Sequence, residues 1–163
     1  MGEKPLYYGW CENGFVFGSE LKALRRSPGF SNAISRDVLT LYLRYSYIPA
    51  PYSIYEGIYK LEAGCMLTIS LAATAKGPAS VPHAPCRGDG WKIQRYWSLH
   101  KQVMEGQSSL IHDEQDALTS LESALKESIQ LQSIADVPLG AFLSGGVDSS
   151  LIVALCNRRQ PGL

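Results

Sequence analysis

The segment "LSGGVDSS", residues 143–150, constrains the fold of this chain more than any other. The run before it, Asp136–Leu143, is short and almost continuously apolar, which predicts a strand buried on both faces of a parallel sheet. The run after it, 149–159, predicts a helix that ends in two arginines and is stopped by Pro161-Gly162. A strand, a loop of small residues and a helix N-terminus in this order predict an anion-binding site.

The residue types of the loop suit a phosphate group. Gly145 and Gly146 let the backbone turn and bring its N–H groups close to a ligand. The helix adds its unsatisfied donors and the positive end of its dipole, and Asp148 would hold Mg²⁺ among phosphate oxygens. The hydroxyl groups available for further hydrogen bonds are those of Ser144, Ser149 and Ser150.

Two other interpretations of the loop need weighing. The spacing and the lysine of a Walker A loop are missing, and the pattern is not GxGxxG. A tight strand-to-helix turn, in which the serines only cap the helix, would use the same residues. For SGGxDS directly after a buried strand, we favour the phosphate site.

The composition describes a globular chain with balanced charge. Of its 163 residues, 45% are hydrophobic, and 15 basic residues balance 15 acidic ones. Binding of nucleic acid or a membrane surface through bulk charge is therefore not expected. Neither a signal peptide nor a membrane span is predicted, which favours a soluble, cytoplasmic protein.

The cysteines do not suggest a disulfide framework or a metal site. No CxxC pair occurs among the four, which are Cys11, Cys65, Cys86 and Cys156. His83 and Cys86 have the spacing of half a zinc site, but no second pair accompanies them. Their proline-rich surroundings favour a plain loop.

The N-terminal part predicts short strands and one helix. "PLYYGW" and "GFVFGSE" are expected to form two strands around a turn at Asn13-Gly14. A short helical turn follows and stops at Pro28-Gly29, and Ser35 is expected to cap a helix through residues 36–45. Residues 48–61 are predicted to be an ordered loop and 64–71 a strand.

Further along, 72–90 is rich in Ala, Gly, Pro and Ser, and is predicted to be an exposed hairpin loop or insertion with residues 91–97 as its returning strand. A new unit is expected near Ser98. Residues 113–131 predict a helix with an acidic first turn. Its apolar stripe, expected to face a core, consists of Leu118, Leu121, Leu125 and Ile129.

"SGGVDSS" resembles the PP-loop of the ATP pyrophosphatases, which cleave ATP between its α- and β-phosphates. That loop is similar in GMP synthetase, NAD synthetase and tRNA-thiolating enzymes, so the loop alone does not identify the substrate. The other segments occur in an order that resembles glutamine-hydrolysing asparagine synthetase across nearly the whole chain, least between Ala72 and Gly90. They are "GEKPLYYGW", "FGSELKAL", "YIPAPYSIYEGIYKLEAGCMLTISL", "RYW" and "DVPLGAFLSGGVDSS".

The resemblance implies a fold class and two domains. Residues 1–97 would be the C-terminal part of a glutaminase domain, an α+β remnant of a four-layer αββα, Ntn-hydrolase-like sandwich. Residues 98–163 would begin a doubly wound α/β synthetase domain, adenine nucleotide alpha hydrolase-like, that binds ATP. In this family glutamine supplies ammonia, and aspartate and ATP form β-aspartyl-AMP, from which ammonia displaces AMP.

The resemblance also implies site residues. Leu143 would lie near the adenosine of ATP, Ser144, Gly145 and Gly146 would bind phosphates, and Asp148 would bind Mg²⁺. Ser149 falls on the same nucleotide loop. For Lys4 and Glu20, on segments that match glutaminase strands and the turn after them, we expect a structural role.

The chain departs from the family at its ends. The family's nucleophile is an N-terminal cysteine, whereas residue 1 is Met and residue 2 is Gly. We therefore expect no catalytic nucleophile and no glutaminase activity in this chain, which we interpret as a fragment truncated at both ends. Ala63 and Cys65 stand where the family usually has proline and histidine, and we expect only a packing change there.

Three hypotheses follow for function. The first is an asparagine synthetase with glutamine, aspartate and ATP as substrates, although this chain alone is expected to bind ATP weakly and to make no asparagine. The second is a related amide ligase, such as a β-lactam synthetase or a modifier of cell-surface sugars. The third is a non-catalytic module that pairs with an intact subunit or with itself through exposed apolar surface.

Overall fold

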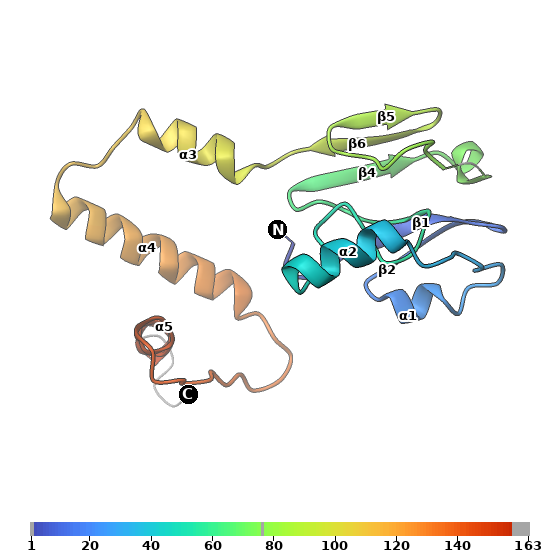
Figure 1. The fold of residues 1–163 in the computed structure, drawn as a ribbon. Coiled ribbons are helices and arrows are strands. Elements are labelled where there is room, and N and C mark those ends of the chain that lie inside the picture. The colour runs from blue at the N-terminus through green and yellow to red at the C-terminus, as the bar shows by residue number, and fades with distance from the viewer. Residues whose placement is uncertain (1, 76, 158–163) are drawn as a thin grey trace. The chain divides into compact units, whose positions relative to one another are not determined.

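The computed structural model describes residues 2–75 and 77–157 and divides the chain into two compact units, Met1–Glu105 and Gly106–Leu163. The first unit contains both sheets of the described chain, and the second consists of helices and extended segments (Figure 1). The boundary we predicted at residues 97 and 98 stays a prediction. Within the described residues, no helix is both long and apolar enough to cross a membrane.

The first sheet of unit 1 is built on a tight hairpin. Strands β1 (Tyr7–Cys11) and β2 (Gly14–Gly18) pair antiparallel, with Cys11 opposite Gly14, so Glu12 and Asn13 form the two-residue turn. The predicted hairpin is therefore confirmed. Strand β3 (Ile58–Lys60) pairs with the other side of β1 and gives the order β2-β1-β3. It lies in the segment we predicted to be a loop.

The second sheet has the order β4-β6-β5, with β4 at Cys65–Ile69, β5 at Cys86–Gly88 and β6 at Trp91–Arg95. All its pairs are antiparallel, so β6 is the returning strand that the sequence predicted. The prediction of an exposed loop over 72–90 is wrong in part, because the short helix η1 (Leu71–Ala75) buries Ala73 and the segment contains β5. Apolar side chains that pack on the core keep this segment folded back.

Two helices flank the sheets of unit 1. Helix α1 (Leu21–Leu24) is one short turn that buries Leu24. Helix α2 (Arg36–Tyr45) begins where we predicted, because the hydroxyl of Ser35 accepts a hydrogen bond from Val38 N at 3.3 Å. Such a cap satisfies one of the donors that every helix leaves free in its first turn.

The core of unit 1 joins its two sheets. Tyr8 and Tyr59 come from the first sheet, and Cys65 and Ile93 come from the second. Tyr8 is only 1% exposed and its ring centroid lies 5.8 Å from that of Tyr59. Trp10 packs against this cluster and donates its indole N–H to the carbonyl of Ala73 at 3.1 Å. Unit 1 is thus an α+β unit with antiparallel sheets and a core rich in aromatic residues.

Helix α3 (Leu99–Gln107) crosses the boundary between the units, and α4 (Glu114–Gln132) and α5 (Val147–Asn157) lie in unit 2, where they contact each other. Helix α4 confirms the predicted helix, with the carboxylate of Asp113 accepting from Asp116 N at 2.9 Å as its N-cap. The predicted arginines and the Pro161-Gly162 stop lie outside the described residues.

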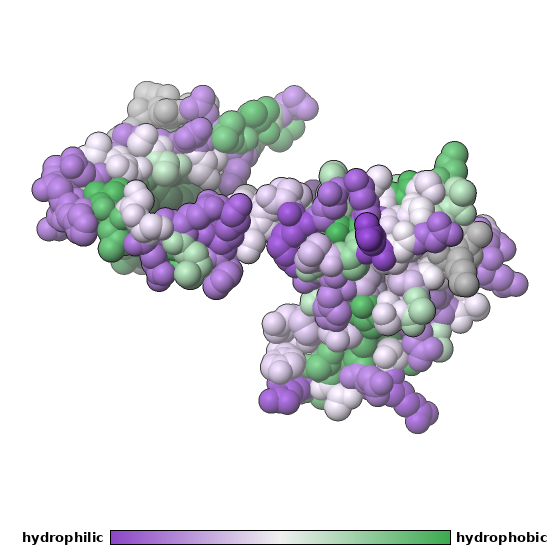
Figure 2. All heavy atoms as spheres, turned by 90° about the horizontal axis from the view of Figure 1, so that it is seen from above, coloured by the Kyte–Doolittle hydropathy of each residue, from purple (hydrophilic) through white to green (hydrophobic). Residues whose placement is uncertain are grey.

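The prediction that α4 faces a core is wrong. Leu118 and Leu121 are 53% and 55% exposed, and no residue of α4 is buried. An apolar stripe is buried only where other elements cover it, and among the described residues of unit 2 only α5 packs on α4 closely. Figure 2 shows apolar surface, in green, on both units.

The predicted buried strand at 136–143 is also wrong. This segment forms no strand, and its Phe142 is 100% exposed. A strand exists through hydrogen bonds to a neighbouring strand, and the described part of unit 2 contains no strand for it to pair with. The apolar segment therefore belongs to no sheet.

Candidate functional site

The loop between the extended segment and α5 is the candidate site. Gly145 has φ +82°, in the left-handed region, and a Cβ atom built there would meet no heavy atom within 4 Å. The backbone conformation, and not lack of space, therefore requires glycine at this position. This turn directs the chain from the extended segment into the first turn of α5.

Gly146 caps the N-terminus of α5. Its carbonyl accepts the N–H of Ser150 at 3.1 Å, the first hydrogen bond of the helix. In any α-helix the N–H groups of the first turn have no acceptor within the helix, so those of Val147, Asp148 and Ser149 stand at the positive end of the helix dipole. The predicted combination of a glycine turn and a helix N-terminus is present.

Two serine hydroxyls lie together over this turn. The oxygens of Ser144 and Ser149 are 3.0 Å apart, and Ser149 donates to the carbonyl of Gly146 at 3.1 Å. Ser144 is exposed and Ser149 is half-buried, so both are within reach of a ligand at the surface. Hydroxyl groups next to free N–H groups form a set of donors suited to an anion.

Asp148 and Leu143 complete the predicted set. Asp148 lies in the first turn of α5 and is exposed, and Leu143 is 63% exposed just before the loop. A single carboxylate beside phosphate oxygens suits Mg²⁺, which often keeps several water ligands and binds through one or two carboxylates. Nowhere in the described chain, this loop included, could a group of three or more His, Cys, Asp and Glu residues hold a metal ion.

The remaining predicted residues lie in unit 1. Glu20 stands at the start of α1, makes no side-chain cap and pairs with Lys22 at 2.7 Å, while Lys4 is exposed. All four cysteines are free. Burial raises the pKa of Cys11, Cys65 and Cys86, which disfavours the thiolate that a cysteine nucleophile needs.

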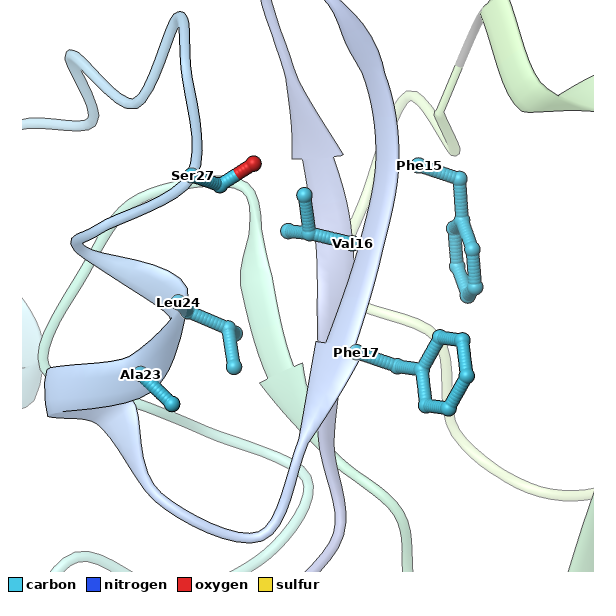
Figure 3. A pocket seen from close by; sticks show the side chains of 6 residues that line it. All are labelled: Phe15, Val16, Phe17, Ala23, Leu24 and Ser27. Carbon is cyan, nitrogen blue, oxygen red and sulfur yellow. The ribbon is translucent and has the colours of Figure 1, made fainter.

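An open pocket of about 290 Å³ lies between β2 and α1 in unit 1. Figure 3 shows Val16 directed toward Leu24 and Ala23 on one side of β2, with Phe15 and Phe17 on the other side. The other lining residue is Ser27. The lining contains no titratable side chain, and none of the predicted site residues belongs to it.

The sequence offered the hydroxyl of Ser150 for hydrogen bonds to a ligand, but in the structure this hydroxyl bonds back to its own helix. Ser150 donates its hydroxyl to the carbonyl of Gly146 at 2.8 Å. The signal was available, because a serine four residues after a helix cap commonly bonds back to that carbonyl.

Two known families match different parts of the chain. A model described as a glutamine amidotransferase domain matches residues 1–78, and one described as asparagine synthase matches residues 120–163. No solved structure matches the chain significantly.

Curated relatives match almost the whole chain. A protein of Methanocaldococcus jannaschii, provisionally named asparagine synthetase [glutamine-hydrolyzing] 2, is 33% identical over 95% of this chain and 26% of its own length. Asparagine synthetases [glutamine-hydrolyzing] 1 and 3 of Bacillus subtilis are 29% and 28% identical, over 100% and 95% of this chain and 22% of their own lengths. The chain thus spans about a quarter of the length of these relatives.

Proposed function

Because this chain belongs to the family of glutamine-hydrolysing asparagine synthetases, we propose that the protein carrying it makes asparagine from aspartate, ATP and glutamine-derived ammonia. Residues 1–97 would contribute to an αββα glutaminase domain, and residues 98–163 would begin a doubly wound ATP-binding domain. None of the three relatives described above is named as a β-lactam synthetase or a sugar-modifying enzyme, which favours asparagine as the product.

In this proposal the loop of unit 2 binds the diphosphate of ATP. Ser144, Gly145, Gly146 and Ser149 would donate hydrogen bonds to the β- and γ-phosphates, and Leu143 would contact the adenosine. The arrangement that supports this role is the set of two hydroxyls and free N–H groups at the N-terminus of α5. These donors are oriented before the ligand arrives, which is the condition for stabilising a leaving group's charge.

The proposed reaction has two steps. In the first, a carboxylate oxygen of the aspartate side chain forms a bond to the α-phosphorus of ATP, and the bond from that phosphorus to the oxygen between the α- and β-phosphates breaks. The electron pair leaves on pyrophosphate, whose charge the loop stabilises. Ammonia next attacks the acyl carbon, loses a proton and displaces AMP, which leaves the amide of asparagine.

A magnesium ion is part of the proposal. When bound, it would neutralise charge on the phosphate oxygens. Asp148 would hold it from the first turn of α5, where its carboxylate is exposed. We also propose a cytoplasmic location, because ATP is a substrate and the four cysteines are unpaired. Self-association or association with another subunit remains part of the proposal as well.

The observation that carries the proposal is the turn at Gly145, whose φ of +82° leads into the N-terminus of α5 in a segment that matches the asparagine synthase model. To test it, the chain is titrated with Mg-ATP while its amide resonances are followed by NMR. We expect those of Gly145, Gly146 and Asp148 to move, with a dissociation constant on the order of millimolar. If they do not move in the folded chain, the site assignment is wrong.

A pair of glycine variants sharpens the test. Gly140 and Gly145 both lie in open space, but only Gly145 has a positive φ. Gly145→Ala should strain the turn and weaken the Mg-ATP response, whereas Gly140→Ala should leave it unchanged. Equal responses in the two variants would mean that the turn does not form the binding site.

Activity is tested on a longer protein that contains this chain and the regions that its relatives have beyond the matched part. With aspartate, Mg-ATP and glutamine or ammonia, we expect asparagine, AMP and pyrophosphate in equal amounts. From residues 1–163 alone we expect no asparagine. Formation of ADP in place of AMP would refute the proposed cleavage between the α- and β-phosphates.

A further inference from the structure

The carbonyl oxygen of Gly146 is the acceptor for three donors. They are the N–H of Ser150 at 3.1 Å, the hydroxyl of Ser150 at 2.8 Å and the hydroxyl of Ser149 at 3.1 Å. A carbonyl oxygen offers two lone pairs, so three donors compete for two places. The shortest of the three contacts belongs to the hydroxyl of Ser150.

The hydroxyl of Ser149 has one proton and more than one acceptor for it. That proton is donated either to Gly146 or to the hydroxyl of Ser144, 3.0 Å away. A bound phosphate would be a third acceptor, and a charged one, to which hydrogen bonds are roughly twice as strong as to a neutral group. Whether Ser149 is available to phosphate thus depends on how strongly Gly146 holds its proton.

We propose that Ser150 is a positioning residue for the phosphate site, which fills the carbonyl of Gly146 and thereby leaves the hydroxyl of Ser149 available to the ligand. The inference rests on the proposed function, because it takes a diphosphate as the ligand of this loop. Ser150 itself does not contact the ligand. The hydroxyl and the N–H of Ser150 together occupy both lone pairs of the Gly146 carbonyl oxygen. Ser149 therefore loses only a weak hydrogen bond to that oxygen when its hydroxyl turns to a phosphate.

The hydroxyl of Ser150 acts on the ligand only through Ser149. Without the hydroxyl of Ser150, one place on Gly146 falls open, and Ser149 is the nearest hydroxyl that can fill it. Ser149 would then be held by its own helix cap when the ligand arrives.

The test measures binding of magnesium pyrophosphate to the chain by NMR, using the amide resonances of Gly145 and Gly146. Ser150→Ala is expected to weaken binding about three- to tenfold, since it costs part of one hydrogen bond to a charged group. Ser150→Thr keeps an oxygen that can bond back to the fourth preceding carbonyl, so it should restore wild-type affinity. A loss in Ser150→Thr equal to that in Ser150→Ala would overturn the inference.

A double-mutant cycle separates positioning from a general effect on the helix. In a Ser149→Ala background there is no hydroxyl to release, so adding Ser150→Ala should change the affinity no further. If the two losses add, Ser150 acts independently of Ser149 and the inference fails.

Ser133→Ala is the matched control, because the hydroxyl of Ser133 also donates to the carbonyl four residues before it, that of Ile129 in α4. It should bind like wild type, and a similar loss there would also count against the inference.

The outcomes distinguish this inference from the proposed function. If pyrophosphate leaves the resonances of the wild-type loop unmoved, the phosphate site itself is wrong. If wild type and Ser150→Ala bind equally well, the phosphate site stands and only the role of Ser150 is wrong.

Discussion

Arg95 and Glu62 form an ion pair of 3.1 Å that joins β6 to the segment between β3 and β4. The second carboxylate oxygen of Glu62 accepts the N–H of Ala84 at 2.7 Å. The guanidinium of Arg95 also donates to the carbonyls of Ala63 and Ala84, at 3.2 and 3.3 Å. The two side chains therefore hold three separate segments of unit 1 together, and they are only 31% and 23% exposed.

Glu62→Gln should destabilise unit 1, because it removes the charge that Arg95 faces while keeping the size of the side chain. We expect a loss of about 1–2 kcal/mol in the free energy of unfolding, measured by urea titration with tryptophan fluorescence. The control is Lys22→Ala, which breaks the pair with Glu20, where the side chains are 83% and 58% exposed. That change should leave the free energy of unfolding unchanged within the error of the titration, because an exposed ion pair is screened by water. Equal losses would show that the Glu62 pair is an ordinary surface pair.

Tyr8→Phe should stabilise the protein at neutral pH. Among the described residues, the hydroxyl of Tyr8 is the buried side-chain polar atom without a hydrogen-bond partner. Leaving such a group unsatisfied costs about 1–3 kcal/mol, so its removal should raise the free energy of unfolding by about 1 kcal/mol. Tyr42→Phe, at a side chain that is 49% exposed, should change stability by less than about 0.5 kcal/mol. A loss of stability in Tyr8→Phe would reveal a hydrogen bond to water.

The same residue should make stability depend on alkaline pH. Burial, with smaller contributions from Cys86, Tyr59 and nearby acidic groups, raises the pKa of Tyr8 in the folded state. The unfolded chain releases this proton near pH 10, so the stabilisation is complete below about pH 10 and is lost as pH rises. Tyr59 and the buried thiols shift the same way, whereas burial lowers the pKa of Lys60, which has the opposite effect.

Tyr8→Phe should therefore lose less stability than wild type between pH 10 and about pH 11.5. The two slopes should differ by at most about 1.4 kcal/mol per pH unit, the value for one proton. Urea midpoints measured across this range give the comparison, since Tyr59, Lys60 and the thiols are the same in both proteins. Parallel curves would mean that Tyr8 does not titrate differently in the folded and unfolded states.

Local signals in the sequence predicted local structure well. The hairpin signal around Asn13-Gly14 and the cap at Ser35 each depend on a few neighbouring residues, and both the hairpin and the cap are present, with Glu12 and Asn13 as the turn residues. Strands β3 and β5 were missed because each has three residues, and its pairing with a neighbour decides that it is a strand.

Interactions that depend on distant parts of a chain were less predictable. The apolar pattern of 136–143 indicates a tendency to be buried, but it supplies neither the covering elements nor a partner strand. The glycine turn at Gly145 was predictable because glycine adopts a positive φ more readily than other residues do, and Gly145 has one. The role of Ser150 needed the structure, since only the distances show that three donors share the carbonyl of Gly146.

Gly64→Ala should be among the most damaging small changes in unit 1. Gly64 has φ +67°, and an added Cβ atom would clash with the backbone carbonyl oxygen of Trp97, which cannot rotate away. The carbonyl of Gly64 also accepts the N–H groups of Tyr96 and Trp97, at 2.9 and 3.2 Å. We expect a loss of about 2–4 kcal/mol by urea titration.

Gly106→Ala is the control, because Gly106 lies in α3 with no heavy atom within 4 Å of an added Cβ. Alanine is a better helix former, so this variant should gain up to about 1 kcal/mol. A Gly64→Ala variant as stable as wild type would mean that the turn before β4 can move away from Trp97.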